Sequence, residues 1–290
     1  MSNGVIVGLT LHYRDASRTF NCLRSLLEGG VSHVLVWDNS ADGEASAAEL
    51  ERLMGSERRY RIVTVNRNLG FAAGVNRGLE TLAVEFPDSP VLLINNDATL
   101  LPDALRVFRD ALEASPNAEV LYPDIDHGGW VRGTVYYHRL TGLITDRRLP
   151  GSFPYASGCC LLVNLPKSGA TLFDEDFFMY GEDVELGARL SRCNSAMVHV
   201  PKLLVHHEGS ASSRMGSPFY EARIVAAHWI IASKLSKGRF DWLLVMVLRG
   251  VWLGLRSLVR SLRFRSLTPL RALCDGTRVA KESRRSQSPV

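Results

Sequence analysis

The sequence predicts an α/β protein with a mostly parallel central sheet, helices on both faces of the sheet and an amphipathic helical extension at the C-terminus. Apolar runs typical of strands alternate with segments of helical spacing over the first 120 residues, and the connections are short. The 290 residues are 46% apolar and 22% charged, which is typical of globular proteins and excludes a disordered or collagen-like chain. Beyond about residue 240 the pattern changes to a long apolar segment interrupted by arginines.

Five strands and four helices are expected to alternate in the first 122 residues. The strands are short and apolar, whereas the helices repeat apolar residues every three to four positions. Strands are expected at residues 5–11, 33–37, 60–65, 90–94 and 119–122, and helices at 16–27, 45–54, 71–84 and 102–114. Because ligands of such sheets bind beyond the carboxyl ends of the strands, the polar turns there are candidate site residues.

The remainder of the chain is expected to contain fewer parallel strands. Residues 123–156 are predicted to form a hairpin or loop region, 157–163 a strand, and 173–194 an acidic cluster followed by a helix. Short strands are expected at 196–200 and 203–205, and a helix at 219–235. We therefore predict a domain at 1–215, with two halves at about 1–122 and 123–215. A basic helical region at 216–275 and a disordered basic tail at 276–290 are expected to follow.

Charge and cysteine usage indicate the compartment. Residues 230–290 carry 13 basic and 3 acidic residues, against 21 basic and 27 acidic residues in the rest of the chain.

Five widely spaced cysteines without a C-x-x-C motif argue against a disulfide framework or zinc ribbon and favour a reducing environment. No basic segment precedes the first apolar run, so we expect a strand there rather than a signal peptide. No uncharged apolar stretch of about 18 residues occurs, so no plain transmembrane helix is expected.

The segment at 240–265 combines apolar bulk with an arginine stripe. Arg249, Arg256, Arg260 and Arg263 are separated by 7, 4 and 3 positions, which places them on one helical face. This pattern predicts an in-plane amphipathic helix that attracts anionic lipid. A helix packed on the catalytic domain or at a subunit interface is the alternative. Nucleic acid is not an expected partner, because the arginines are embedded in apolar sequence and no recognition motif is present.

Two turns after strands are candidates for nucleotide and metal binding. Small residues at 68–78 would let backbone N–H groups approach an anion at a helix N-terminus, although a tight turn with close helix packing explains them equally. The segment matches neither the dinucleotide-binding nor the P-loop pattern. Asp97, in Asn95-Asn96-Asp97, follows a buried strand, where a carboxylate and diphosphate oxygens could hold Mg²⁺ or Mn²⁺. A turn or helix-cap aspartate is the alternative.

An acidic cluster and a histidine pair complete the candidates. Residues 173–185 crowd carboxylates among aromatic side chains, which raises a carboxyl pKa and suits a general base, and Glu182 and Asp183 lie at the expected start of the helix. Acidic residues that complement a helix dipole are the alternative. His206 and His207 follow a predicted strand and could bind or orient a metal, although such a pair is more often structural.

Taken in order, these motifs resemble the inverting family 2 glycosyltransferases with the GT-A fold, and among them the rhamnosyltransferase-like branch. The resemblance covers residues 4–213. It departs from the family at the first D-x-D position, which is an asparagine, and in the first loop, where the family usually has an aromatic residue and Asn. The motifs are Thr10-Leu11-His12-Tyr13, Trp37-Asp38-Asn39-Ser40-Ala41-Asp42-Gly43, N-x-G-F-A-x-G-x-N-x-G at 68–78, Asn95-Asn96-Asp97, F-D-E-x-F-F-M-Y-x-E-D-V-[DE] at 173–185 and H-x-G-x-x-S-like residues 207–212.

The resemblance implies that the domain at 1–215 is catalytic, with a nucleotide-sugar half at about 1–122 and an acceptor half at about 123–215. It also implies a role for each motif. Asp38 would accept the N3–H of a pyrimidine, Asp97 would hold the metal with His207 or His206 nearby, and Asp183 would be the general base. The implied nucleotide-sugar contacts are Thr10, Leu11, His12, Asp38, Asn39, Asn68, Gly70, Phe71, Asn76, Asn95, Asn96 and Asp97; the implied catalytic residues are Asp183 and Glu182; the implied acceptor contacts are Ser157, Gly158, Cys159 and Tyr180; and the implied metal ligands are Asp97 and His207.

The implied reaction is a single displacement that inverts the anomeric carbon, with Mg²⁺ or Mn²⁺ stabilising the departing diphosphate. The favoured donor is dTDP-L-rhamnose, other dTDP- or UDP-sugars (galactofuranose, glucose, galactose) being alternatives. The acceptor would be a saccharide or lipid-linked saccharide in bacterial cell-surface polysaccharide synthesis. A nucleotidyltransferase or a non-catalytic nucleotide-sugar-binding protein stays open. We expect a cytoplasmic protein, peripheral on the inner face of the plasma membrane, and the sequence is compatible with a homo-oligomer.

Overall fold

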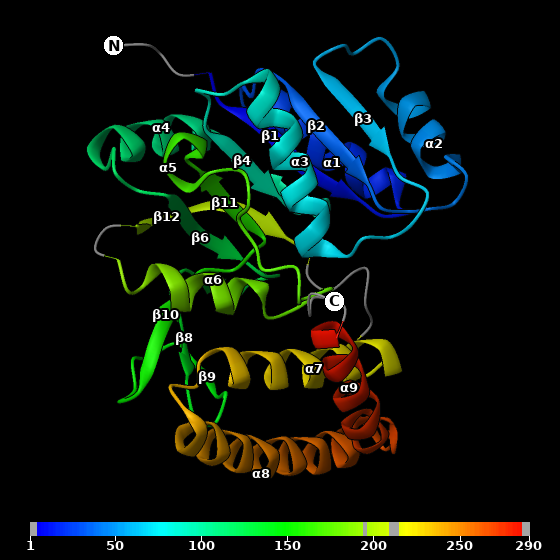
Figure 1. The fold of residues 1–290 in the computed structure, drawn as a ribbon. Helices are drawn as coiled ribbons and strands as arrows, with labels where there is room; N and C mark the ends of the chain where they lie inside the picture. The colour runs from blue at the N-terminus through cyan, green and yellow to red at the C-terminus, as the bar shows by residue number, and fades with distance from the viewer. Residues whose placement is uncertain (1–4, 194–195, 209–214, 286–290) are drawn as a thin grey trace.

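The computed structural model describes residues 5–193, 196–208 and 215–285 (Figure 1). A mixed sheet forms the centre of the molecule, in the order β3-β2-β1-β4-β11-β6-β12-β5, with β7 paired to β6. Neighbours among the first four strands are parallel, whereas β11 pairs antiparallel with β4 and β6. The strands are β1 (Val7–His12), β2 (Val34–Asp38), β3 (Tyr60–Thr64), β4 (Val91–Ile94), β5 (Ala98–Leu100), β6 (Val120–Asp126), β7 (Val131–Arg132), β11 (Cys160–Val163) and β12 (Met197–His207).

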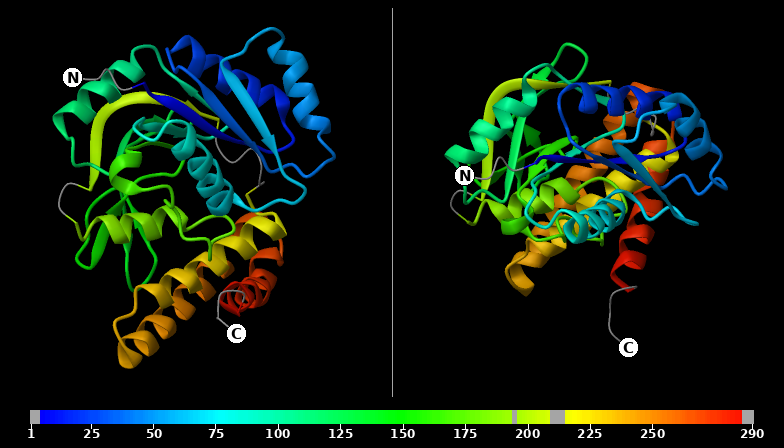
Figure 2. Two further views of the ribbon diagram at one scale, coloured as in Figure 1. Left: turned by 45° about the horizontal axis from the view of Figure 1, so that its top comes forward. Right: turned by 90° about the horizontal axis from the view of Figure 1, so that it is seen from above.

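Helices cover both faces of this sheet, which confirms the predicted fold class. On one face α1, α2 and α4 pack against the strands, and on the other α3 and α6 do so (Figures 1 and 2). The short helix α5 follows β11. The helices of this region are α1 (Ala16–Glu28), α2 (Ala45–Met54), α3 (Phe71–Glu85), α4 (Ala104–Ala114), α5 (Leu165–Ser168) and α6 (Glu182–Leu190).

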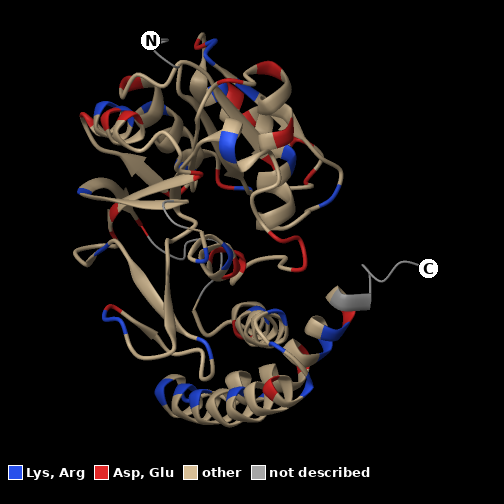
Figure 3. Ribbon diagram, turned by 60° about the vertical axis from the view of Figure 1, so that its left-hand side comes forward, with Lys and Arg blue, Asp and Glu red and all other residues tan. Residues whose placement is uncertain are grey.

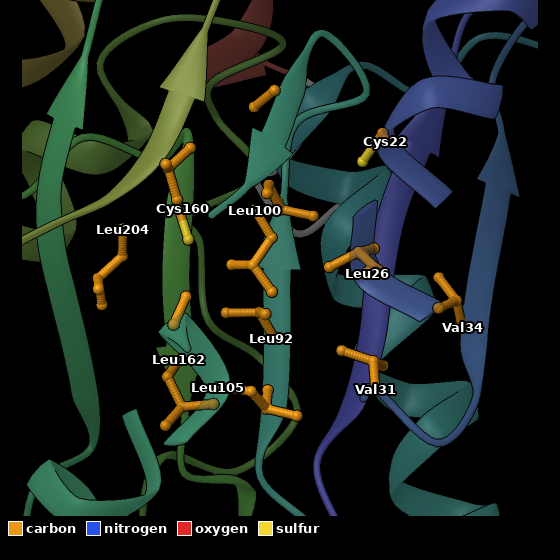
Figure 4. Close-up of a cluster of buried hydrophobic side chains, with 14 of the residues drawn as sticks. Cys22, Leu26, Val31, Val34, Leu92, Leu100, Leu105, Cys160, Leu162 and Leu204 are labelled. Atoms are coloured by element: carbon orange, nitrogen blue, oxygen red, sulfur yellow. The ribbon is translucent and has the colours of Figure 1, made fainter. Parts of the chain in front are cut away.

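The two hydrophobic layers follow from the alternation of side chains along each strand. In β4, Leu92 packs toward α1 and α4, whereas Leu93 belongs to the layer under α3 and α6. Figure 4 shows Leu92 of β4 between Leu162 of β11 and Leu26 of α1, all in the same buried cluster. Because every residue of β4 and β11 is buried, both faces of these strands must be covered, and apolar runs without alternation result.

A second layer lies beyond α6. A three-stranded antiparallel sheet, in the order β10-β8-β9, packs with α6, α7 and α9 around a separate apolar cluster, and α8 packs against α7 and α9. Figure 1 shows α8 at the edge of the molecule, with α7 between α8 and the rest of the protein. The elements are β8 (Val135–His138), β9 (Ile144–Thr145), β10 (Ser152–Tyr155), α7 (Pro218–Lys234), α8 (Arg239–Phe264) and α9 (Thr268–Arg285).

The predicted disordered tail at 276–290 is wrong for residues 276–285, which form the last part of α9. Ala272, Gly276 and Ala280 recur every four positions and are buried, and a Cβ added at Gly276 would lie 2.6 Å from Val225 Cβ of α7. Small residues let the two helices approach closely. The basic, polar composition of this segment did not predict that contact. Residues 286–290 lie outside the described part of the chain. Two smaller differences are β5, which was not expected, and β12, which is continuous rather than two short strands.

Three of the four arginines of the stripe, Arg249, Arg256 and Arg260, face the protein, so the lipid-facing orientation predicted for them is wrong, whereas Arg263 is exposed. Arg249 has no exposed surface, and its guanidinium donates to the hydroxyl of Tyr137 and to the carbonyl oxygen of Arg139. Arg256 Nη1 and Arg260 Nε donate to Glu221 of α7 over 3.1 and 2.9 Å. A buried charge must be paired, and these pairs attach α8 to the body of the protein.

The pairing of Glu221 generates a stability prediction. The Glu221 side chain is 0% exposed, so Glu221→Ala leaves two arginines, each about one-sixth exposed, without their shared partner. Breaking a buried pair from one side costs about 3–5 kcal/mol, and we expect the lower end here because both arginines reach solvent. Urea unfolding measures the loss. The control Glu80→Gln, which removes the surface pair with Arg77, should change stability by less than about 1 kcal/mol. Equal effects of both variants would contradict the structural role of Glu221.

Candidate functional site

Four strand ends meet at one edge of the central sheet. The parallel ladder of β1 and β2 ends at the pair His12–Asp38, and Asp97 follows the parallel strand β4. Because β11 runs antiparallel to β4, its first residues, preceded by Gly158, lie at the same edge. Residues that are far apart in the sequence therefore leave the sheet side by side.

Hydrogen bonds connect the loop after β4 to the start of α6. Asn95 N donates to Cys159 O over 2.8 Å, and Gly158 N donates to Asp183 Oδ2 over 3.4 Å. Asp183 and the residues that precede Asp97 thus contact the same short segment before β11. The predicted metal-binding carboxylate and the predicted base belong to one connected cluster.

Asp97 and His207 form a pair of potential metal ligands. His207 Nε2 lies 3.1 Å from Asp97 Oδ1, and both side chains are largely buried. The sequence left His206 and His207 as alternatives; His206 instead contacts Asp126 through Nδ1 at 2.9 Å and is half exposed. Among the described residues, no group of three His, Cys, Asp or Glu side chains is arranged to hold a metal. Two protein ligands leave most of the coordination sphere to substrate oxygens or water, as hard divalent cations commonly require.

His127 is a site residue that the sequence did not indicate. It follows β6, and its Nδ1 shares a hydrogen bond of 2.9 Å with Nδ1 of His207. The bond leaves Nε2 of His207 directed at Asp97, so His127 fixes the ring orientation of the potential ligand. No local motif marks His127, and only the parallel pairing of β6 with β12 brings the two histidines together.

Glu182 and Asp183 are the first two residues of α6, and the pKa values of both carboxyl groups are raised. Burial is the main cause that raises the pKa of both, and the charge of Asp183 raises that of Glu182 further. Hydrogen bonds from the backbone N–H groups of Gly158 and Val184 act against this and favour the ionised form of Asp183, whose pKa is raised to about 6. A carboxyl group with this pKa is ionised at neutral pH and is basic enough to accept a proton.

The glycine-rich segment at 68–78 packs closely instead of forming an open anion site. Phe71 N, the first N–H of α3, donates to Phe178 O over 2.6 Å, so the helix N-terminus is already covered. A Cβ added at Gly70 would lie 2.3 Å from the same oxygen, and one added at Gly78 would lie 2.5 Å from Leu9 Cδ1. The structure thus shows the close packing that was the alternative interpretation of this segment, and a contact of Gly70 with a nucleotide stays a prediction. The Phe71 ring lies near Gly158, beside Asp183.

Two predicted nucleotide-binding asparagines hold loops together. Asn76 is fully buried, and its amide binds the backbone of Phe173 and the N–H of Leu172 as well as Glu175. Asn39 Nδ2 donates to Gly70 O over 2.8 Å. Both amides are engaged inside the protein, and their predicted contact with a nucleotide stays a prediction.

The first strand also places side chains inside the protein. Thr10 and His12 have no exposed surface, and the distance between His12 Nδ1 and Thr19 Oγ1 is 2.7 Å; the nucleotide contacts predicted for these two residues stay predictions. Leu11 is half-buried and faces Gly74 of α3. The exposed Asn68 accepts a hydrogen bond from Gly70 N.

A pocket of about 490 Å³ opens beside this strand end, lined by Arg14, Arg18 and Asn96 among others. Arg14 N donates to Ser40 Oγ over 2.7 Å, and Ser40 N donates to Asp38 Oδ1 over 2.8 Å. The pocket thus lies between the loop that carries Asp38 and the loop that carries Asp97. The two arginines were missed because the family motifs end before them, although two cations beside a strand end are a usable signal for a diphosphate site.

The predicted acceptor residues lie around Asp183. Gly158 and Cys159 are buried, and Ser157 Oγ accepts from Cys159 N over 3.3 Å. Tyr180, with φ of +68°, packs its ring edge-on against Tyr220 of α7. Helix α7 therefore helps to form this side of the site. The motif residues beyond Glu208 lie outside the described residues.

Comparison with known proteins identifies the family. The model of glycosyl transferase family 2 matches residues 12–166, which span more than half of the chain. The chain belongs to glycosyltransferase family 2. Of the site residues, the match includes Asp38, Asp97 and Gly158. The family assignment makes this protein a glycosyltransferase.

Individual relatives agree with this assignment. The N-acetylglucosaminyl-diphospho-decaprenol L-rhamnosyltransferase of Mycobacterium tuberculosis is 29% identical over 286 residues, covering 86% of this chain and 90% of that protein. S. aureus TarS 1–349 shares the fold with a TM-score of 0.54 at 13% identity, covering 98% of this chain and 93% of that one. GalNAc-T7, solved with UDP, GalNAc and Mn²⁺, has a TM-score of 0.53 at 10% identity, covering 91% and 59%. The fold is thus the GT-A fold predicted from the sequence.

The close contact at Gly70 can be tested against a glycine with the same backbone conformation. Gly70 (φ +83°, ψ 178°) and Gly169 (φ +71°, ψ −177°) share their dihedral angles, but space is open around Gly169. Each glycine-to-alanine change carries backbone strain of about 1–2 kcal/mol, and overpacking against Phe178 should add about 1–3 kcal/mol at Gly70 only. Thermal and urea unfolding of Gly70→Ala and Gly169→Ala measure the difference. Equal losses would show that the Phe178 loop does not depend on this contact.

Proposed function

We propose that the protein transfers L-rhamnose from dTDP-L-rhamnose to a lipid-linked saccharide, with inversion of the anomeric carbon, in bacterial cell-surface polysaccharide synthesis. The observation that carries this proposal is the arrangement at the sheet edge, where Asn95 and Asp183 both form hydrogen bonds with the segment just before β11, and Asp97, two residues after Asn95, pairs with His207. The sugar and the acceptor are suggested by the mycobacterial relative, whose name specifies both. A screen of dTDP- and UDP-sugars for transfer tests the donor, and transfer from a UDP-sugar alone would overturn the choice of rhamnose.

Asp97 and His207 would hold a divalent cation, Mg²⁺ or Mn²⁺. A carboxylate and an imidazole nitrogen that face each other at 3.1 Å fit such a role, and the neighbouring Asn95 and Asn96 supply further oxygen atoms. A bound cation stabilises the negative charge that develops on the departing diphosphate. Arg14 and Arg18, in the adjacent pocket, would bind phosphate oxygens as charge-assisted donors.

Asp38 would orient the nucleotide from the other side of that pocket. Its Oδ1 accepts from Ser40 N, which fixes the carboxylate at the end of β2. A carboxylate offers acceptors only, as the N3–H of a pyrimidine requires. The proposed base contact and the proposed cation site therefore flank the pocket, and the nucleotide would lie between them.

Asp183 would remove the proton from the acceptor hydroxyl. Its Oδ2 lies beside Gly158 N, and the protonated form of the buried neighbour Glu182 would prevent two negative charges from meeting. Ser157 and Tyr180 would contact the acceptor on the side closed by α7. A lipid-linked acceptor would bring the enzyme to the cytoplasmic face of the plasma membrane as a peripheral protein.

Replacement of the base gives a direct test. Asp183→Asn should lower kcat by about 10²–10⁴-fold while dTDP binding persists, because only the proton acceptor is lost. Transfer of radiolabelled rhamnose measures the rate, and isothermal titration measures the binding. Asp88→Asn, an exposed carboxylate just before β4 at the opposite edge of the sheet, is the matched control. Unchanged turnover of Asp183→Asn would refute the assignment.

The pH profile provides an independent check. Because burial raises the pKa of Asp183 to about 6, protonation removes the base as pH falls below that value. We therefore expect kcat to rise with pH through about 6 and then level off. A rate that stays constant between pH 5 and 7 would contradict Asp183 as the base.

The orienting role of His127 predicts an effect on metal binding. His127→Ala frees Nδ1 of His207 from its 2.9 Å partner, and loss of such an outer partner typically lowers metal affinity about 10–100-fold. Electron paramagnetic resonance of free Mn²⁺, titrated with protein and dTDP, measures this affinity without turnover. His33→Ala, a histidine that precedes β2 and contacts Phe86, is the control. If both variants bind Mn²⁺ like the wild type, His127 does not orient a metal ligand.

A further inference from the structure

One face of α8 is an exposed apolar stripe. Its members recur at three- and four-residue intervals, and each exposes half or more of its surface. At 1.5 Å per residue, the stripe extends over about 33 Å of helix. Soluble monomers rarely leave apolar patches beyond a few hundred Å² uncovered. The apolar stripe consists of Phe240, Leu243, Leu244, Val247, Val251, Leu255, Leu258, Val259 and Leu262.

The opposite face of α8 already has its packing partners. Val245, Arg249, Leu253 and Ser257 are buried at four-residue intervals against the rest of the protein. Figure 1 shows α7 on that side of α8, and the apolar stripe is directed away from it. Within the described chain, therefore, no element covers the stripe.

Charge at the two ends of the stripe identifies its partner. Lys237 and Arg239 are exposed at the start of α8, and Arg263 and Arg265 are exposed at its end. Figure 3 shows α8 as mostly uncharged ribbon with several basic positions. An apolar face bracketed by cations fits the acyl and headgroup regions of an anionic bilayer.

A second copy of the chain fits the same face less well. The one acidic residue of α8, Asp241, is already engaged by Arg139 at 2.8 Å. A two-fold pair of antiparallel stripes would place the cations at the start of one helix beside those at the end of the other. Like charges would then meet at both ends, without exposed carboxylates on α8 to compensate them.

The inward arginines also decide how α8 meets the bilayer. The helix is long and apolar enough to cross a membrane, with a mean hydropathy of 1.6. Arg249 is buried against Tyr137, however, and Arg256 and Arg260 share Glu221 of α7. A spanning α8 would have to break these contacts or draw α7 into the hydrocarbon, where charged groups are costly.

We propose that α8 is an in-plane membrane helix, whose apolar stripe inserts into an anionic bilayer surface while its arginine face binds the protein. The inference rests on the proposed function only in that a lipid-linked acceptor would place the enzyme at that surface. The proposal assigns membrane binding to the apolar face of α8, which lies opposite the arginine face that the sequence predicted to bind lipid. Binding by this face would hold α7, and with it the acceptor side of the site, at a fixed orientation to the membrane.

Flotation with vesicles of phosphatidylglycerol and phosphatidylcholine tests the surface. The variant Val251→Glu/Leu255→Glu should reduce the bound fraction at least tenfold, because two charges enter the inserted face. The control Val84→Glu/Val131→Glu changes two equally exposed valines outside α8 and should bind like the wild type. Vesicles of phosphatidylcholine alone should bind less protein. Equal flotation of both double variants would overturn the proposal.

Two further measurements separate the alternatives. If sedimentation velocity without lipid shows a dimer that Val251→Glu/Leu255→Glu converts to monomer, the stripe joins two copies and the proposal fails. The free, exposed Cys193 and Cys274 report sidedness when protein is added to sealed vesicles. An in-plane α8 leaves both open to an impermeant maleimide. Protection of Cys274 alone, which ends when the vesicles are permeabilised, would show a spanning helix and overturn the proposal.

The outcome for the stripe can be separated from that for the reaction. Flotation needs no substrate, and dTDP binding shows that a variant is folded. A wild type that binds dTDP but not anionic vesicles overturns the stripe alone. A wild type that floats with vesicles but transfers no sugar overturns the proposed function alone.

Discussion

The antiparallel pairing of β11 with β4 is the constraint on which the site depends. The pair Cys160–Ile94 fixes the register, and Asn95 N donates to Cys159 O just beyond it. This contact puts the loop after β4 beside Gly158, whose N–H then meets Asp183. A shift of one residue would exchange the two faces of a strand that is buried on both sides, so the hydrophobic layers hold the register. The proposed metal side and the proposed base side of the site are thus adjacent because the core is packed.

The loop that leads to α6, and so to the proposed base Asp183, is held by buried polar contacts rather than by regular structure. Asn76 of α3 satisfies the backbone of Leu172 and Phe173, and Phe71 N binds Phe178 O. If either partner of such a buried hydrogen bond is removed, the other is left unsatisfied and the folded state is destabilised, which makes the attachment specific. Features that resemble an anion-binding loop in the sequence therefore position the segment that leads to α6. The candidate site is therefore formed by the edge of the sheet together with the loop that leads to α6.

The C-terminal helices follow the same logic of covering one face and leaving another. Buried pairing of Glu221 with Arg256 and Arg260 turns the charged face of α8 inward. The apolar residues must then point outward, opposite to the orientation expected for a helix in water. An orientation that exposes an apolar face is unfavourable unless another apolar phase covers that face, so the internal ion pairs and the proposed bilayer contact are physically connected.

The sequence by itself determined the α/β fold, the parallel pairing of its first strands and the position of Asp97, because period, turn residues and motif order are local signals. It also indicated Asp183 at the start of a helix. It could not show that Asn76 and Thr10 are buried, that His127 meets His207, or that the arginines of α8 face the protein. These features depend on partners distant in the chain, and only tertiary packing decides which side of an amphipathic element meets which neighbour. The small residues that pack α9 on α7 were hidden for the same reason, since a basic composition says nothing about close helix contact.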